Sequence, residues 1–255
     1  MLKLFASDVD GTLLNRGETE LSEAVKRSVS ELLASGIAFA AVSGRDVFSL
    51  RRLFSFAEND VYLAACSGAL CVKGGHTLFC RPVSAESVRR ALKHSRESGE
   101  NAVFSAESAQ YVHGSAEFFD HINEISGGSA VRINSLPEIK GLVCKISFFS
   151  RNSVLGFAET PSELRVCNEG GGWKEYIRCI AGKSAALSEI QSRIGASRSD
   201  TAAAGNESSD RGMLLRAGCR FAADDTLAEE TDASRFHSPG ELCVYISEIM
   251  RLSSR

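Results

Sequence analysis

Residues 3–12 read KLFASDVDGT, a short apolar run that leads into two aspartates two positions apart. The run over 3–7 has the length of a buried strand. Ligands of an open parallel sheet bind beyond the carboxyl ends of its strands, so Asp8 and Asp10 are predicted to form a compact anionic site at such an end. A strand end followed by an Asp-Gly turn with solvated acids is the alternative interpretation of residues 8–12.

The next segments alternate between helix and strand patterns. Ser22 can cap a helix whose apolar residues recur at helical spacing as far as Gly36, and 37–42 is a continuous apolar run of strand length. A second helix pattern from Asp46 and a buried strand at 61–65 follow. Strands joined through helices by short connections predict right-handed βαβ units, so the fold class is α/β with a doubly wound parallel sheet.

The middle of the chain changes character after Pro82. Helix patterns begin at Ser84 and near Phe118, and short strand candidates separate them. These strand candidates lie at 103–105, 110–112, 143–149 and 173–180. The mixture predicts an inserted α+β domain with a partly antiparallel sheet, after which the first pattern returns at Lys183. The predicted boundaries are a core of residues 1–82 and 183–255 and a cap of residues 83–182.

Composition and charge restrict the function classes. The 255 residues are 44% hydrophobic and 24% charged, as in ordinary globular proteins, and the formal net charge is −3. This balance supplies no basic field for nucleic acid and no polybasic anchor for a membrane, so neither partner is expected. Two carboxylates within the first ten residues argue against a signal peptide, and no apolar run approaches the ~18 residues of a membrane span. We expect a cytoplasmic monomer or homodimer.

Eight cysteines are scattered along the chain, and none of them forms a C-x-x-C pair. Structural zinc sites and thioredoxin-type redox motifs need such spacing, so the pattern argues against both. In a reducing cytoplasm most of these cysteines are expected to be small buried apolar side chains.

Polar residues also stand at three later points of the core pattern. Ser43, Gly44 and Arg45 end the second strand, where a hydroxyl and backbone N–H groups can hold phosphate oxygens, although alone they are more typical of an ordinary turn. Lys183 can neutralise the charge of a phosphoryl group, although alone it is typical of a solvated surface. The loop 205–210 is rich in oxygen ligands. Because such loops meet at one edge of a sheet, they predict a phosphate site with Mg²⁺, which prefers oxygen ligands.

Taken in order, these motifs resemble those of the haloacid dehalogenase-like superfamily of phosphatases, and within it the Cof-type, class IIB branch. The matching segments are 8–12, 43–45, 67–69 where the family usually has Asn-Gly-Ala, 173–177, 183–187, and 205–214 in place of the family's G-D-x-x-N-D-x-x-M-L. The resemblance implies a Rossmann-like core with a C2-type cap inserted before Lys183. It also implies an Mg²⁺-dependent phosphatase that hydrolyses a small phosphorylated metabolite, such as a sugar phosphate, through an aspartyl-phosphate.

The resemblance also implies roles for individual residues. Asp8 would be the nucleophile and a metal ligand, and Asp10 would be the general acid and base, with its backbone carbonyl on the metal. Ser43, Gly44, Arg45 and Lys183 would bind the phosphoryl group and position the substrate, and Asn206 and Asp210 would complete the metal site. Substrate choice would lie in the cap, where His113, Glu169, residues 170–172 and Trp173 are candidates, although His113 and Trp173 are equally explained as structural residues.

Two positions depart from the family pattern. Asn206 stands where the family has aspartate, and Ser209 stands where it has asparagine. An amide oxygen can still bind Mg²⁺ but carries no formal charge, so weaker metal affinity and reduced turnover are expected. Glu207 is a possible replacement carboxylate. These departures leave a catalytically weakened phosphate-binding protein open as an alternative. A phosphomutase that uses the same aspartyl chemistry is a second alternative.

Overall fold

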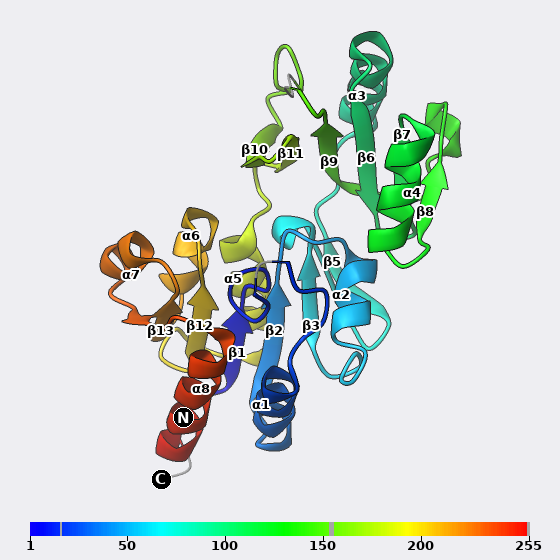
Figure 1. Ribbon diagram of the computed structural model, residues 1–255. Coiled ribbons are helices and arrows are strands. Elements are labelled where there is room, and N and C mark those ends of the chain that lie inside the picture. Colours follow the sequence, from blue (N-terminus) through cyan, green and yellow to red (C-terminus); the bar gives the residue numbers. More distant parts are fainter. Residues whose placement is uncertain (16, 153–155, 254–255) are drawn as a thin grey trace.

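The computed structural model describes residues 1–15, 17–152 and 156–253, which form two sheets with their helices (Figure 1). The first sheet has the strand order β14-β13-β12-β1-β2-β3-β4-β5. Its strands are β1 (Leu4–Ser7), β2 (Ala38–Val42), β3 (Tyr62–Ala65), β4 (Leu70–Lys73), β5 (His76–Cys80), β12 (Thr201–Gly205), β13 (Cys219–Ala222) and β14 (Ser234–Arg235). The strands from β14 to β3 are parallel, so their carboxyl ends meet at one edge.

Alternating side chains of β1 explain why helices cover both faces of this sheet. Phe5 belongs to the cluster with α1 (Glu23–Ala34), α2 (Val47–Leu53) and α8 (Pro239–Ser253). Leu4 and Ala6 belong to the cluster with α5 (Lys183–Ile194), α6 (Arg211–Leu214) and α7 (Asp225–Thr231). Successive residues of a strand point to opposite faces, so each helical layer packs on every second apolar residue. The prediction of a doubly wound, Rossmann-like α/β core is confirmed.

One edge of this sheet departs from the prediction of a parallel sheet, because β4 and β5 are antiparallel to their neighbours. The chain reverses after β3 through Cys66 and Ser67, whose φ angles of 52° and 54° are left-handed. This reversal is far shorter than the crossover that a parallel strand would need. Gly74 and Gly75, with φ of 55° and 76°, join β4 to β5, and a Gly-Gly pair suits a two-residue hairpin turn with positive φ at both positions.

The second sheet has the order β10-β11-β9-β6-β7-β8 and lies beyond the carboxyl ends of the core strands (Figure 1). Its strands are β6 (Asn101–Ala106), β7 (Gln110–His113), β8 (Ala130–Arg132), β9 (Val143–Phe149), β10 (Leu164–Gly170) and β11 (Trp173–Arg178). The helices of this part are α3 (Ala85–Ser98) and α4 (Ala116–Ile125). Every strand pair is antiparallel except β7 with β8. The predicted α+β cap with a partly antiparallel sheet is therefore present. Its exact limits at residues 83 and 182 stay a prediction.

The alternation along β9 decides what the cap presents to the core. Ile146 and Phe148 are buried in the cluster that includes α3. Lys145 and Ser147 point to the opposite face, where they line a cavity between the two sheets. The cap thus turns polar side chains toward the carboxyl ends of the core strands.

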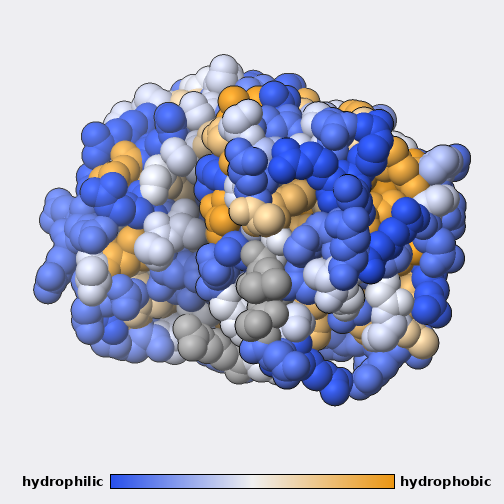
Figure 2. All heavy atoms as spheres, turned by 90° about the horizontal axis from the view of Figure 1, so that it is seen from above, coloured by the Kyte–Doolittle hydropathy of each residue, from blue (hydrophilic) through white to orange (hydrophobic). Residues whose placement is uncertain are grey.

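The outer surface of the cap is mostly hydrophilic, and its hydrophobic residues form separate groups (Figure 2). Across residues 1–15, 17–152 and 156–253, we find no helix with the length and hydropathy that crossing a membrane requires.

The eight cysteines are all free thiols, and Cys66, Cys71, Cys144 and Cys243 are buried.

Candidate active site

Asp8 directly follows β1, and only 3% of its surface is exposed. One carboxylate oxygen, Oδ1, accepts a hydrogen bond of 2.8 Å from Lys183 Nζ, and Oδ2 accepts a long one of 3.3 Å from Thr12 Oγ1. Burial raises the pKa of Asp8 to about 7; the charge of Lys183 opposes this increase and the charge of Asp210 adds to it. Asp8 is therefore a desolvated carboxylate with one weakly bonded oxygen.

A glycine shapes the turn that follows Asp8. The N–H groups of Thr12, Leu13 and Leu14 donate to the carbonyl of Val9, and Gly11 has a left-handed φ of 82°. A Cβ atom on residue 11 would overlap the Nδ2 atom of Asn206. The missing side chain therefore lets the loop that carries Asn206 close on the loop after Asp8.

Lys183 begins α5 and joins two carboxylates. Its Nζ donates to Asp8 Oδ1 at 2.8 Å and to Asp210 Oδ1 at 2.7 Å, and all three side chains are buried. Burial disfavours the ammonium, but the two carboxylates outweigh it and raise the pKa of Lys183. The lysine therefore stays protonated at the buried end of the site.

Ser43 and Arg45 follow β2, as the sequence predicts. Ser43 is buried, and its Oγ accepts a hydrogen bond of 3.1 Å from the Arg45 N–H. Arg45 binds the exposed carboxylate of Asp10 through three hydrogen bonds, from Nε to Oδ2 at 2.8 Å and to Oδ1 at 3.1 Å, and from Nη2 to Oδ1 at 2.6 Å. Asp46 then caps α2 by accepting from the N–H groups of Phe48 and Ser49. The C-terminal end of the loop between strand and helix is thus anchored on α2.

The loop after β12 supplies Asn206 and Asp210 in different environments. Asp210 is fully buried, and its Oδ2 accepts from the N–H groups of Asn206 and Glu207 while Oδ1 accepts from Lys183. Asn206 Oδ1 is buried and finds no hydrogen-bond partner within the described ranges. Asp210 therefore anchors the site in this arrangement, whereas Asn206 holds an unsatisfied oxygen.

These donors allow a test of the expected metal site. Within the described part of the chain, no group of three or more His, Cys, Asp or Glu residues is arranged to hold a metal ion. An unpaired amide oxygen of Asn206 and the loosely bonded Oδ2 of Asp8 nevertheless follow neighbouring parallel strands. Oxygen donors of this kind suit Mg²⁺, so the residues present fit the ion with one carboxylate fewer than the family pattern supplies.

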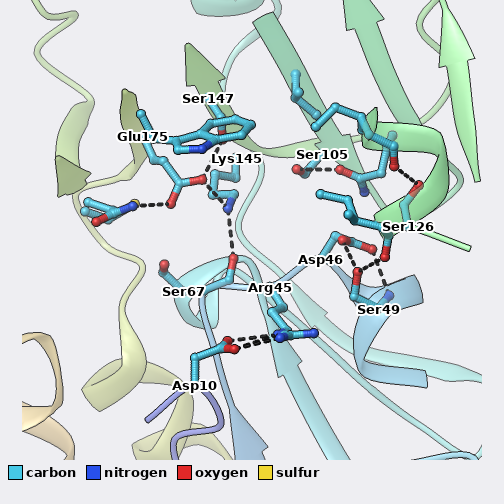
Figure 3. A pocket seen from close by; sticks show the side chains of 18 of the residues that line it. Asp10, Arg45, Asp46, Ser49, Ser67, Ser105, Ser126, Lys145, Ser147 and Glu175 are labelled. Carbon is cyan, nitrogen blue, oxygen red and sulfur yellow. Dashed lines mark hydrogen bonds and ion pairs between the residues drawn. The ribbon is translucent and has the colours of Figure 1, made fainter. Parts of the chain in front are cut away.

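A cavity of about 530 Å³ separates these residues from the cap. Its core wall includes Asp8, Asp10, Gly44, Arg45 and Lys183, and its cap wall includes Ser105, Gln110, Lys145, Ser147, Trp173 and Glu175. Figure 3 shows Asp10 and Arg45 on one side of this space and Lys145, Ser147 and Glu175 on the other. Ser43, Asn206 and Asp210 are not among the lining residues. The cavity therefore joins the predicted phosphate site to polar residues of the cap.

A sequence profile described as haloacid dehalogenase-like hydrolase matches residues 5–235. The chain belongs to this family of hydrolases. The hydrolase is 21% identical over 245 residues to the 5-amino-6-(5-phospho-D-ribitylamino)uracil phosphatase YbjI of Escherichia coli (strain K12). This alignment covers 93% of this chain and 90% of that protein. The predicted membership of the haloacid dehalogenase-like superfamily, Cof-type, and the prediction of a phosphoric monoester hydrolase are confirmed.

Solved structures share the fold of the hydrolase. A haloacid dehalogenase-like hydrolase from Bacteroides thetaiotaomicron matches with a TM-score of 0.84 at 17% identity, over 98% of this chain and 100% of that chain. The subclass IIB sugar phosphatase BT4131 matches with a TM-score of 0.75 at 15% identity, over 97% of this chain and 98% of that chain. The likeness extends over both sheets and thus includes the cap.

The cap wall of the hydrolase contains residues that the sequence analysis missed. Lys145 is a charged residue within a strand whose other residues are almost all buried, and Glu175 is itself buried within β11. A buried charge signals that a partner lies nearby. Among the cap candidates, Trp173 lines the cavity, while its ring also packs against Phe149 at 4.9 Å. His113 does not line it, because its Nδ1 lies 2.7 Å from Ser95 Oγ of α3, on the opposite face of the sheet.

Proposed function

We propose that this hydrolase is an Mg²⁺-dependent phosphatase of a small phosphorylated metabolite, a sugar phosphate by class, and that it acts through an aspartyl-phosphate on Asp8. The observation that carries the proposal is the buried contact of 2.8 Å between Asp8 and Lys183 on the wall of the cavity. A carboxylate beside an ammonium combines a nucleophile with charge that neutralises the phosphoryl oxygens.

The reaction has two steps in this proposal. Asp8 attacks phosphorus, a bond forms between its oxygen and phosphorus, and the ester oxygen leaves with a proton from Asp10. Water then loses a proton to Asp10 and attacks phosphorus, which releases inorganic phosphate and restores the Asp8 carboxylate. Arg45 holds Asp10 beside the cavity, while Lys183, which also lines it, binds phosphoryl oxygens. Ser43 keeps the phosphoryl-binding role that its position directly after β2 predicts.

The metal would be held by oxygen atoms of the same loops. These are the carboxylate of Asp8, the backbone carbonyl of Asp10 and the amide oxygen of Asn206, with Asp210 completing the site. When bound, the ion supplies positive charge next to the phosphoryl oxygens. Glu207 lines the cavity, but its side chain already accepts a hydrogen bond from the backbone of Asp210 in its own turn.

Replacing Asn206 with aspartate is expected to tighten Mg²⁺ binding about tenfold, because a carboxylate adds a formal charge to the donor set. Isothermal titration with Mg²⁺ measures the affinity directly, and phosphate release at limiting Mg²⁺ measures the accompanying increase in rate. The matched control is Asn59→Asp, which adds the same charge to an exposed residue in the loop before β3, at the opposite end of that strand. Unchanged affinity and rate in Asn206→Asp would contradict the weakened-site hypothesis.

The cap wall indicates the chemistry of the leaving group. Gln110 is 3% exposed, and its Oε1 accepts from Ser105 Oγ at 2.8 Å while its Nε2 has no partner in the described part of the chain. An unpaired buried amide costs about 1–3 kcal/mol, which a substrate oxygen at this position recovers. Trp173 adds an aromatic surface to the same wall. A neutral leaving group with hydroxyl or carbonyl oxygens satisfies these groups.

Gln110→Leu is expected to raise the KM for such a metabolite about tenfold, because the mutant lacks the Nε2 donor. The kcat should change little, since Gln110 lies on the cap wall. Steady-state kinetics with the metabolite and with phenyl phosphate, whose leaving group has no oxygen besides the ester oxygen, separate the two effects. Ser105→Ala is the control, because it removes the bond to Gln110 and keeps the donor. An equal KM increase for both esters would rule out this recognition.

A screen of phosphorylated metabolites with Mg²⁺ tests the function itself. The panel contains hexose and pentose phosphates and a phosphorylated ribitylamino-uracil, and Asp8→Asn is the blank for released inorganic phosphate. Release above the blank is the expected result. Return of the phosphoryl group to substrate without release would favour the phosphomutase alternative, and saturable binding with no release above the blank would favour the binding-protein alternative.

A further inference from the structure

Lys145 of β9 and Glu175 of β11 form a buried ion pair on the face of the cap sheet that is turned to the core. Lys145 Nζ lies 2.5 Å from Glu175 Oε1, and the two residues are 6% and 9% exposed. Removing two charges from water is costly unless their remaining hydrogen-bonding groups are satisfied.

The cap satisfies the carboxylate end of the pair. Glu175 Oε1 also accepts from Ser147 Oγ at 2.8 Å, and Oε2 accepts from Asn168 Nδ2 at 3.2 Å. Burial alone would favour the neutral acid, but the ammonium of Lys145 and these donors outweigh it and lower the pKa of Glu175. Glu175 is thus a fixed anion that orients the Lys145 ammonium.

The ammonium end of the pair reaches across to the core. Lys145 Nζ donates to the backbone carbonyl of Gly44 at 2.8 Å, and Figure 3 shows Lys145 between Glu175 on one side and Arg45 with Asp10 on the other. Gly44 stands between Ser43 and Arg45, the two residues with proposed roles at the phosphoryl group and at Asp10. We call residues 43–45 the phosphate loop. A side chain of the cap therefore donates a hydrogen bond to the middle residue of this loop.

The three carbonyls of this loop are held from two different parts of the molecule. The carbonyl of Ser43 accepts from the Ser67 N–H at 2.9 Å, and the carbonyl of Arg45 accepts from the Cys66 N–H at 2.7 Å. Both of these donors belong to the core, whereas the donor to Gly44 belongs to the cap. The outer carbonyls keep their partners wherever the cap is, but the middle one has Lys145 only while cap and core are in this arrangement.

We propose that Lys145, oriented by Glu175, is a positioning residue that couples cap placement to the geometry of the phosphate loop. Its bond to Gly44 fixes the peptide units that carry Ser43 and Arg45, so the loop reaches its bonded form when the cap covers the cavity. The inference rests on the proposed function for its catalytic consequence. The mechanical link itself requires no turnover.

Lys145→Met tests the link, because methionine keeps the aliphatic length and removes the donor. Amide hydrogen exchange of the segment 42–48, measured without substrate, is expected to accelerate about tenfold, and kcat to fall about 10- to 100-fold with a smaller change in KM. Exchange is independent of catalysis, so absent turnover in the wild-type protein would count against the proposed function and leave the positioning test intact.

Two further variants separate positioning from a merely structural ion pair. Lys145→Met/Glu175→Gln removes both charges and keeps one acceptor oxygen, for Ser147 or Asn168, so its stability should recover most of the loss seen in Lys145→Met. In this variant the amide hydrogen exchange of residues 42–48 should stay fast and kcat should stay low, and recovery of both would overturn the proposal.

Lys174→Met is the matched control, because Lys174 pairs with Glu169 at 3.1 Å and does not line the cavity. Faster loop exchange in this control would also overturn it.

Discussion

Asp8→Asn is expected to lower phosphate release about 10⁴-fold or more, because a carboxamide cannot form the covalent phosphoryl intermediate. The variant should fold normally, since the asparagine oxygen can still accept the hydrogen bond that Asp8 accepts from Lys183 at 2.8 Å. Single-turnover phosphate release gives the rate, and thermal unfolding verifies the fold.

The matched control for this substitution is Asp60→Asn, an exposed residue in the loop before β3, at the opposite end of that strand. It should retain the full rate. If Asp8→Asn keeps more than about one hundredth of the wild-type rate, Asp8 is not the nucleophile, because loss of a nucleophile costs far more than this.

Lys183→Met is expected to affect both stability and catalysis. Removal of the ammonium leaves the buried carboxylates of Asp8 and Asp210 without the partner that lies 2.8 Å and 2.7 Å away. Breaking a buried ion pair on one side costs about 3–5 kcal/mol of unfolding free energy. Loss of the positive charge at the phosphoryl group should also lower kcat about 10²- to 10³-fold. Denaturant unfolding and steady-state kinetics measure the two losses.

A second substitution distinguishes the two roles of Lys183. Lys183→Met/Asp210→Asn removes one of the two orphaned charges, so it should regain part of the lost stability while kcat stays low. Lys93→Met, at an exposed position of α3, should change neither quantity. A double variant that regains wild-type kcat would show that Lys183 acts only as a structural counter-ion.

The sequence predicts the parts of the fold that depend on neighbouring residues. Ser22 accepts from the Val25 N–H at the start of α1, and Ser84 accepts from the Ser87 N–H at the start of α3, as their cap signals indicate. The strand β10 was missed because most of its residues are exposed, so it lacks an apolar run. The hairpin of β4 and β5 was missed although Gly74 and Gly75 signal its turn.

The candidate site likewise contains residues that the sequence predicts and contacts that it does not. Asp8 and Ser43 could be found because each directly follows a predicted strand, and Asp10 lies two residues beyond Asp8. A parallel sheet brings such positions to one edge. The contact of Lys145 with Glu175 could not be found, because it depends on the register of β9 with β11 rather than on local spacing. Its bond to Gly44 further depends on how the cap is seated on the core.

The pairing of β1 has a consequence for the order in which the protein acquires its structure. β1 lies between β2 and β12, and its Leu4 is opposite Thr201. During synthesis from the N-terminus, the whole cap sheet up to Arg178 emerges before β12 exists. Until then β1 has one unpaired side, and the late, distant pairing is a slow kind of folding step. A nascent chain can thus complete its cap sheet early. Asp8 and Asp210 pair with their common partner Lys183 only after residue 210 has been synthesised.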